Sequence, residues 1–259
     1  MDKNTKFFTK SRLAYYRAMS PMDWDAHWAA EFTSAIYPEH PVGLGMLSFI
    51  SEVLPRGGKI LEAGCGMGHI VHELRMQGFD CEGVDSAALT IARIHGMKPD
   101  LPVRVGDLLH LDVPDAFYAG YISLGVLEHL EEGPEPLLAE AHRVLAQNGV
   151  AIFTVPFCST IRLIKARLGL FSSPPALGEC FYQYAFTREE FVEIVQKSGF
   201  RVLQVNYYDP WKGLKDELPP CSWLNSKPSL AWKCRAWADK QTWLYPHAAH
   251  MLALVCVKQ

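Results

Sequence analysis

From residue 59 onward, short apolar runs alternate with segments in which apolar residues recur every three or four positions. The apolar runs predict strands at 59–63, 80–84, 103–105, 119–124 and 150–155. The segments between them predict helices at 70–77, at 137–146, and from an N-cap at Ser86 to residue 95. A repeated strand and helix order indicates a parallel sheet with right-handed crossovers. We therefore expect an α/β fold.

The N-terminal part of the chain departs from this pattern. Residues 1–55 are rich in aromatic side chains and compatible with helices, until Pro55-Arg56-Gly57-Gly58 interrupts the chain. We expect residues 1–55 to form a helical lid or substrate segment, and residues 56–259 to form the main domain.

The C-terminal part also departs from the alternation. Thr187 and Glu190 have the spacing of a capping box at the start of a helix. Strands at 201–207 and 251–257 follow, separated by about forty irregular residues that hold five of the seven tryptophans. The main domain is thus expected to carry insertions at about 157–186 and 208–250.

Charge and cysteine content exclude several classes of protein. The 259 residues carry a formal net charge of −3 and no long run of like charges, whereas a nucleic-acid surface needs a basic face. The seven cysteines are odd in number and form no C-x-x-C pair, which predicts a reducing, cytoplasmic location and no metal site. No apolar run reaches the roughly 18–20 residues that span a bilayer.

A glycine-rich turn follows the first strand of the alternating region. It reads Glu62-x-Gly64-x-Gly66-x-Gly68. A dinucleotide turn would carry a glycine where His69 stands, and no lysine and hydroxyl pair marks a phosphate loop. A turn without Cβ atoms lets a ligand lie against the main chain.

Two further carboxylates end the next two strands. Asp85 lies 23 positions after Glu62, and Asp107 lies 22 positions after Asp85. At such strand ends a carboxylate can bind ribose hydroxyls or an adenine amino group. The pattern predicts a ligand with an amino-acid part and a nucleoside part, lying across the carboxyl edge of the sheet.

These motifs resemble the class I S-adenosylmethionine-dependent methyltransferases, in the group that includes ubiquinone and menaquinone biosynthesis enzymes. The matching stretches are KILEAGCGMGHI, CEGVDSA, VRVGDLLHL, YISLGVLEHL and LAEAHRVLAQNGVAIFTVP, which lie within residues 55–157, and FTREEFVEIVQKSGFRVLQV extends the likeness to about residue 207. The resemblance implies a Rossmann-like, doubly wound sheet of seven mostly parallel strands. Its last strand would be antiparallel and inserted between the fifth and sixth.

The resemblance also implies which residues bind the cofactor, S-adenosylmethionine. The glycine turn would hold the methionine part, Asp85 the ribose, Asp107 and Leu108 the adenine, and the segment at Leu124 would lie beside the sulfonium. The full set of candidates is Glu62, Gly64, Cys65, Gly66, Gly68, His69, Asp85, Ser86, Asp107, Leu108, Leu124 and Gly125. His69 has a second interpretation, as a cap of the helix that follows the turn.

The best candidate for a catalytic base is His129, which follows the fourth strand. An imidazole near neutral pKa suits proton removal from a hydroxyl, although His129 can equally shape the pocket. The candidates for binding a small methyl acceptor are aromatic and equally compatible with lid packing: Trp24, Trp28, Tyr37, Tyr182 and Tyr184.

Three questions stay open at this point. The basic amphipathic segment at 160–171 fits either contact with a membrane surface or a cover over the active site. An intact set of motifs favours an enzyme that methylates a hydroxyl, amine or activated carbon. The alternative is a protein that binds the cofactor without catalysis. The oligomeric state is not predicted.

Overall fold

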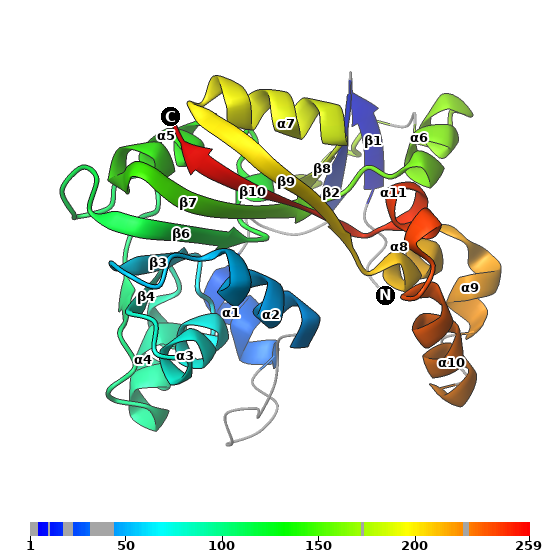
Figure 1. The fold of residues 1–259 in the computed structure, drawn as a ribbon. Coiled ribbons are helices and arrows are strands. Elements are labelled where there is room, and N and C mark those ends of the chain that lie inside the picture. Colours follow the sequence, from blue (N-terminus) through cyan, green and yellow to red (C-terminus); the bar gives the residue numbers. More distant parts are fainter. Residues whose placement is uncertain (1–4, 10, 18–22, 32–43, 172–173, 225–227) are drawn as a thin grey trace.

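A seven-stranded sheet forms the centre of the molecule. The computed structural model describes residues 5–9, 11–17, 23–31, 44–171, 174–224 and 228–259. The strands lie in the order β5-β4-β3-β6-β7-β10-β9, and β10 runs antiparallel to both of its neighbours (Figure 1). Their bounds are β3 Ile60–Ala63, β4 Cys81–Asp85, β5 Val103–Val105, β6 Tyr118–Leu124, β7 Leu145–Pro156, β9 Phe200–Tyr208 and β10 Met251–Lys258. The predicted Rossmann-like sheet with an antiparallel last strand is confirmed.

Helices cover both faces of this sheet because its strands are apolar on both sides. Ile60 packs in one buried cluster with side chains of α2 Leu44–Val53, α3 His69–Met76 and α4 Ala88–Met97. The next residue, Leu61, packs in another cluster with α5 Glu135–Val144 and α7 Arg188–Lys197. Figure 1 shows α5 and α7 on the opposite side of the sheet from α3 and α4. Burial on both faces is typical of parallel sheets.

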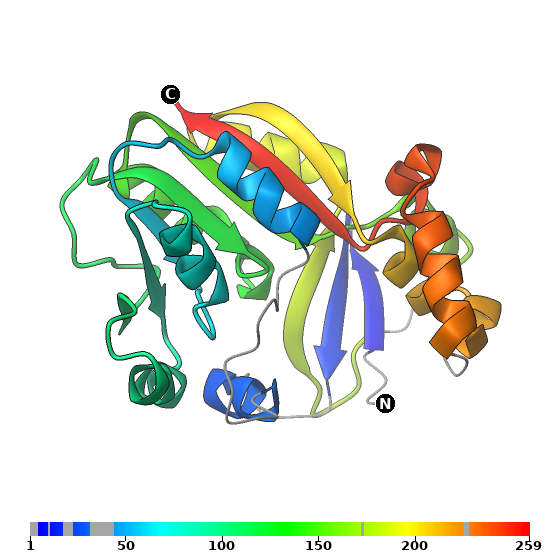
Figure 2. The same cartoon turned by 60° about the horizontal axis from the view of Figure 1, so that its bottom comes forward.

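The helical prediction for residues 1–55 is wrong at its start. The hairpin strands β1 Thr5–Thr9 and β2 Arg12–Arg17 pair with each other, and β2 pairs with β8 Cys180–Phe186, in a separate three-stranded sheet (Figure 2). Leu13 and Tyr15 are buried together with Ala185 and Phe171. Apolar residues two positions apart match the period of a strand, and aromatic residues favour strands. The helical part of the segment is α1 Trp24–Glu31 together with α2.

The prediction of an irregular segment at 208–250 is also wrong. The chain there forms short helices, α8 Pro210–Glu217, α9 Pro219–Leu224, α10 Pro228–Ala238, η2 Thr242–Leu244 and α11 Tyr245–Ala248. Three of them begin with proline, which suits the first turn of a helix. Together with α6 Thr160–Arg167, they gather at one end of the sheet (Figures 1 and 2). Within the described residues, no helix is long and apolar enough to cross a membrane.

Helix capping locates α1 against the main domain. The Thr187 side chain accepts a hydrogen bond from the Glu190 amide at 3.3 Å, as predicted for the N-cap of α7. Ser86, however, makes no such bond at α4. Instead Asp25 of α1 accepts hydrogen bonds from the amides of Leu89 at 3.2 Å and Thr90 at 2.8 Å. A carboxylate from a distant segment thus caps α4 and holds α1 over the carboxyl edge of the sheet.

Candidate active site

The glycine turn leaves β3 in a conformation that side chains disfavour. The φ angles of Gly64, Gly66 and Gly68 are +80°, +47° and +70°. A Cβ at Gly64 would collide with Val126, and a Cβ at Gly66 would lie 2.5 Å from the Trp28 ring. The turn is held by the neighbouring strand β4, since the Gly66 amide donates a hydrogen bond to Asp85 Oδ2 at 2.8 Å. Side chains of the cavity wall therefore pack directly against the main chain of the turn, an approach that only glycine permits.

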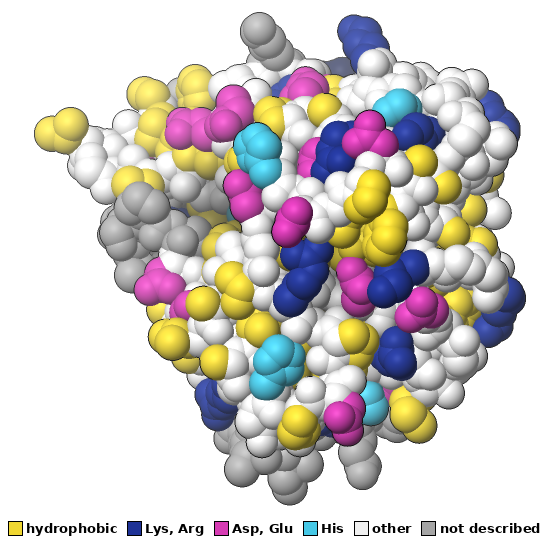
Figure 3. Space-filling view, turned by 90° about the vertical axis from the view of Figure 1, so that its left-hand side faces the viewer, with side chains coloured by type: hydrophobic (Ala, Val, Ile, Leu, Met, Phe, Trp, Pro, Cys, Tyr) yellow, Lys and Arg dark blue, Asp and Glu magenta, His cyan; other side chains and the backbone are white. Residues whose placement is uncertain are grey.

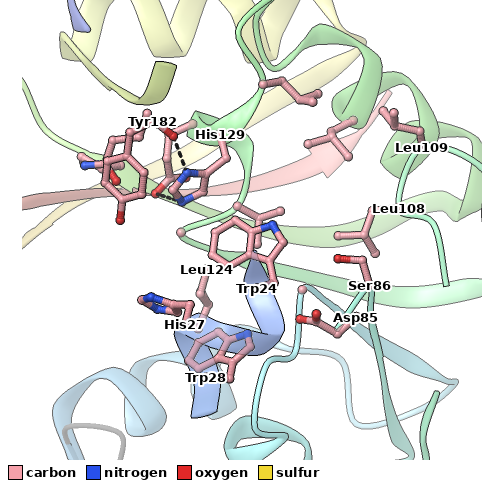
Figure 4. A pocket seen from close by; sticks show the side chains of 18 of the residues that line it. Trp24, His27, Trp28, Asp85, Ser86, Leu108, Leu109, Leu124, His129 and Tyr182 are labelled. Atoms are coloured by element: carbon pink, nitrogen blue, oxygen red, sulfur yellow. Dashed lines mark hydrogen bonds and ion pairs between the residues drawn. The ribbon is translucent and has the colours of Figure 1, made fainter. Parts of the chain in front are cut away.

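A cavity of about 460 Å³ opens at the carboxyl ends of β3, β4 and β6. This volume is in the usual range for small-molecule sites. In Figure 4, Trp24 lies between His129 and Tyr182 on one side and Ser86 and Asp85 on the other. The sequence-predicted residues that line the cavity are Trp24, Trp28, Gly64, Asp85, Ser86, Asp107, Leu108, Leu124, Gly125, His129 and Tyr182.

Other predicted residues lie outside the cavity. Glu62 is buried beneath the glycine turn, where its Oε2 accepts a hydrogen bond from the Val71 amide at 3.2 Å. Burial raises the pKa of the Cys65 thiol well above its usual value, so it is no nucleophile at neutral pH. The hydroxyl of Tyr184 donates to the Glu131 carbonyl at 2.8 Å. Gly66, Gly68 and His69 belong to the turn and the start of α3, and Tyr37 lies outside the described residues.

The His129 ring is held in one orientation and one tautomer. It lies in η1 Leu127–His129, and its Nδ1 is 2.8 Å from the Tyr182 carbonyl oxygen. Because a carbonyl oxygen only accepts, Nδ1 must carry the proton, which leaves Nε2 unprotonated, 3.9 Å from Glu128 Oε1. Burial lowers the pKa of His129 to about 4, so the ring is neutral at pH 7. The Trp24 ring packs edge-on against it, with 4.8 Å between centroids.

Two buried polar atoms in the cavity wall lack partners among the described residues. They are Nε1 of Trp28 and Oε2 of Glu128. Burial raises the pKa of Glu128 to about 8, so this carboxyl carries a proton at neutral pH and can donate a hydrogen bond. Unpartnered buried polar atoms are uncommon in proteins. Their presence, beside a turn that a Cβ would block, fits a polar ligand in this cavity.

Sequence reasoning missed several lining residues, notably His27, Gln183 and His250. Gln183 comes from β8, which reaches the cavity only through its pairing with β2. His250 directly precedes β10 and is placed by the antiparallel insertion of that strand. His27 lies on α1, about one turn after Trp24 and directly before Trp28. Only the position of His250 beside a predicted strand end was a usable signal.

Comparisons with known proteins agree with this geometry. Residues 44–205 match the model of a family described as a methyltransferase domain. A ubiquinone biosynthesis O-methyltransferase from Xylella fastidiosa is 26% identical over 231 residues, covering 82% of this chain and 87% of that enzyme. A protein described as a probable S-adenosylmethionine-dependent methyltransferase, from Mycolicibacterium smegmatis, is 31% identical over 100 residues. That alignment spans 39% of this chain and 38% of the relative.

Solved structures share the fold at low sequence identity. An S-adenosylmethionine-dependent methyltransferase from Mesorhizobium loti is 17% identical with a TM-score of 0.55, covering 83% of this chain and 96% of that one. Another from Archaeoglobus fulgidus is 16% identical, also with a TM-score of 0.55, covering 83% and 92%. The family match spans most of the sheet, including the cavity-lining ends of β3, β4 and β6. The chain therefore belongs to the methyltransferase domain family and is an enzyme that uses S-adenosylmethionine as its cofactor.

Proposed function

We propose that this enzyme methylates a hydroxyl group of a small, mainly aromatic or apolar metabolite. The cofactor supplies a methyl group on a positively charged sulfur. The glycine turn would hold its methionine part, Asp85 and Ser86 the ribose, and Asp107 with Leu108 the adenine, while Leu124 and Gly125 would lie beside the sulfur. Each Asp85 oxygen accepts one backbone amide, from Gly66 or Ala87, and keeps a second lone pair for a ribose hydroxyl.

The unprotonated Nε2 of His129 is the observation that carries this proposal. A neutral imidazole inside the cavity, locked by the Tyr182 carbonyl, can accept the proton of a hydroxyl as that oxygen takes the methyl group. An amine acceptor needs a base less, because a neutral amine nitrogen is nucleophilic enough to take the methyl group and can lose its proton to water afterwards. The name of the Xylella relative, an O-methyltransferase, supports the same choice.

The segments outside the sheet support a small acceptor enclosed by a lid. We propose that α1 and the insertions at about 157–186 and 208–250 close the cavity, to which they bring Trp24, Tyr182 and His250. The face in Figure 3 shows basic and acidic side chains interspersed, which supports a metabolite rather than nucleic acid. The cytoplasmic location stays a prediction. Membrane contact at 160–171 has less support, since Arg162 of this segment is buried.

A comparison of matched acceptors tests the proposal. We expect methyl transfer from labelled S-adenosylmethionine to catechol, and little or none to ortho-phenylenediamine, which has the same shape with amines in place of hydroxyls. Mass spectrometry of the product would identify an aryl methyl ether. Transfer to the diamine but not to catechol would contradict a hydroxyl acceptor. Binding of S-adenosylhomocysteine by calorimetry confirms in the same sample that the cofactor site is intact.

The variant Asp85→Asn tests the cofactor site. Asparagine keeps the size of the side chain but loses the charge and one acceptor oxygen, so the Gly66 or Ala87 amide and the ribose would compete for one acceptor. We expect affinity for S-adenosylmethionine to fall by about 10-fold to 100-fold, the effect of a lost charge-assisted hydrogen bond of about 1.5–3 kcal/mol. The exposed Asp112→Asn is the control. Equal affinities of the two variants would remove Asp85 from the site.

A further inference from the structure

A second cavity adjoins the active site and is strongly basic. It has a volume of about 560 Å³ and lies between the hairpin β1–β2, α6 and α8. Pro156, Tyr182, Gln183 and His250 line both cavities, so the two are neighbours across a shared wall. Its cationic lining residues come from four different elements: Lys6, Arg17, Arg162 and Lys212.

The acidic groups at this cavity do not balance its cations. Among the described residues, Asp216 is the one carboxylate in the lining, and it contacts Lys212 at 3.1 Å. Glu217 lies behind the wall, where its oxygens contact Lys6 at 2.8 Å and Arg162 at 3.0 Å. Lys6, Arg162 and Lys165 all contact the single carboxylate of Glu217, and Lys212 contacts Asp216. These four cations exceed the two carboxylates by about two positive charges.

Anchoring of the helical insertion does not explain so many cations. Glu217 is buried and does connect α8 to the hairpin through Lys6 and to α6 through Arg162 and Lys165. One arginine would be enough to neutralise that carboxylate, because a buried ion pair needs only one cation for each anion. Lys212 contacts Asp216, and the Arg17 guanidinium lies 3.2 Å from the centroid of the Tyr182 ring.

The crowding of positive charge opposes protonation of the groups in the wall. Burial, followed by the charges of Lys212 and Arg162, lowers the pKa of His250 to about 2. Burial also lowers the pKa of Lys6 and of Lys212, in each case with a contribution from Arg162. Gathering like charges in a partly buried place is costly unless an anion accompanies them.

We propose that this basic cavity binds a phosphate or diphosphate group of the methyl acceptor. The inference rests on the proposed function and adds a second part to the substrate. The hydroxyl to be methylated would lie at His129, and the anionic group would lie beyond Tyr182 and Gln183, among Lys6, Arg17 and Lys212. Ammonium groups bind phosphate as point charges, and an excess of two positive charges matches a dianion better than a single carboxylate.

Calorimetry with inorganic pyrophosphate tests the proposal directly on the full chain saturated with S-adenosylhomocysteine. We expect saturable binding to the wild-type chain, and an affinity at least about tenfold lower for Lys212→Gln and for Lys6→Gln, the loss of one charge-assisted contact. Lys197→Gln is the matched control, because Lys197 is an exposed lysine on α7 that contacts Glu193. Its pyrophosphate affinity should equal that of the wild type. Retained S-adenosylhomocysteine binding shows that each variant is folded.

Several results would overturn the inference. They are the absence of pyrophosphate binding at millimolar concentration, an equal affinity in Lys212→Gln, Lys6→Gln and Lys197→Gln, and tighter binding of malonate than of pyrophosphate. A wild-type chain that methylates catechol but does not bind pyrophosphate overturns this inference alone. A chain that binds pyrophosphate in a Lys212-dependent manner but methylates only amines overturns the proposed acceptor and leaves the anion site standing.

Discussion

Replacing Gly66 with valine is expected to lower the affinity for S-adenosylmethionine by at least about 100-fold, or roughly 2.7 kcal/mol. Gly66 has a φ of +47°, and its missing Cβ would lie 2.5 Å from the Trp28 ring. A β-branched residue is a clear outlier in this conformation, at a cost of about 1–2 kcal/mol for the backbone alone. The side chain would also displace Trp28 and fill the surface that we propose for the methionine part of the cofactor. Calorimetry with S-adenosylmethionine measures the change.

Gly78→Val separates the two causes. Gly78 has a φ of +84°, but an added Cβ would have no atom within 4 Å. Both variants should therefore lose stability in urea unfolding, and only Gly66→Val should lose the cofactor. Combining Gly66→Val with Trp28→Ala removes the collision with the Trp28 ring, but the valine side chain still covers the turn. The affinity of this double variant for S-adenosylmethionine should therefore stay low. Unchanged affinity in Gly66→Val would show that the cofactor does not lie on this turn.

The parts of the site that the sequence predicted lie at strand ends. Gly64 and Gly125 directly follow β3 and β6, and Asp85 ends β4. Parallel strands bring their carboxyl ends to one edge of the sheet. Their proximity is therefore a consequence of local patterns combined with one topological rule. The antiparallel β10 followed from the family resemblance, and local pattern alone did not indicate its place between β7 and β9.

The parts that the sequence missed depend on contacts between distant segments. The hairpin strand β2 is placed by pairing Leu13 with Ala185, more than 170 positions later, and no tight-turn signature marks the hairpin. The cap of α4 comes from Asp25 rather than from the neighbouring Ser86. Glu62 is a predicted site residue that tertiary packing removes from the site. Its place beside the glycines suggested a ligand contact, whereas its carboxylate accepts a hydrogen bond from the Val71 amide.

The segments outside the sheet also bring charged side chains close to the site. The active-site cavity carries the acidic residues Asp85 and Asp107 at the carboxyl edge of the sheet. The neighbouring cavity beyond Tyr182 carries an excess of basic residues. The cofactor and an anionic acceptor group would thus bind at parts of the site that carry opposite charge. Such a division orients a two-part acceptor before the reaction, and orientation of this kind contributes strongly to rate in transfer reactions.

His129→Ala is expected to lower the turnover number by about 100-fold to 10,000-fold, the usual contribution of a positioned base. The affinity for S-adenosylmethionine should stay the same, because the ring lies between Trp24 and Tyr182 on the acceptor side of the cavity. His95→Ala, an exposed histidine on α4, is the control and should keep full activity. Steady-state kinetics with catechol, with S-adenosylhomocysteine binding measured in parallel, gives both quantities.

His129→Asn and the pH profile distinguish a base from a residue that only shapes the pocket. The asparagine amide can still donate to the Tyr182 carbonyl, as Nδ1 does at 2.8 Å, but it has no counterpart of the basic Nε2. If His129 is the base, the Asn variant should be as slow as the Ala variant.

Because burial, followed by the charges of Arg17 and His27, lowers the His129 pKa to about 4, protonation should abolish wild-type kcat/KM only below about pH 5. An ordinary imidazole would lose activity near pH 6.5 instead. Full turnover in His129→Asn would show that the residue only shapes the pocket. Loss of turnover in both variants, together with a wild-type acid limb below about pH 5, would show that Nε2 accepts the proton of the acceptor hydroxyl.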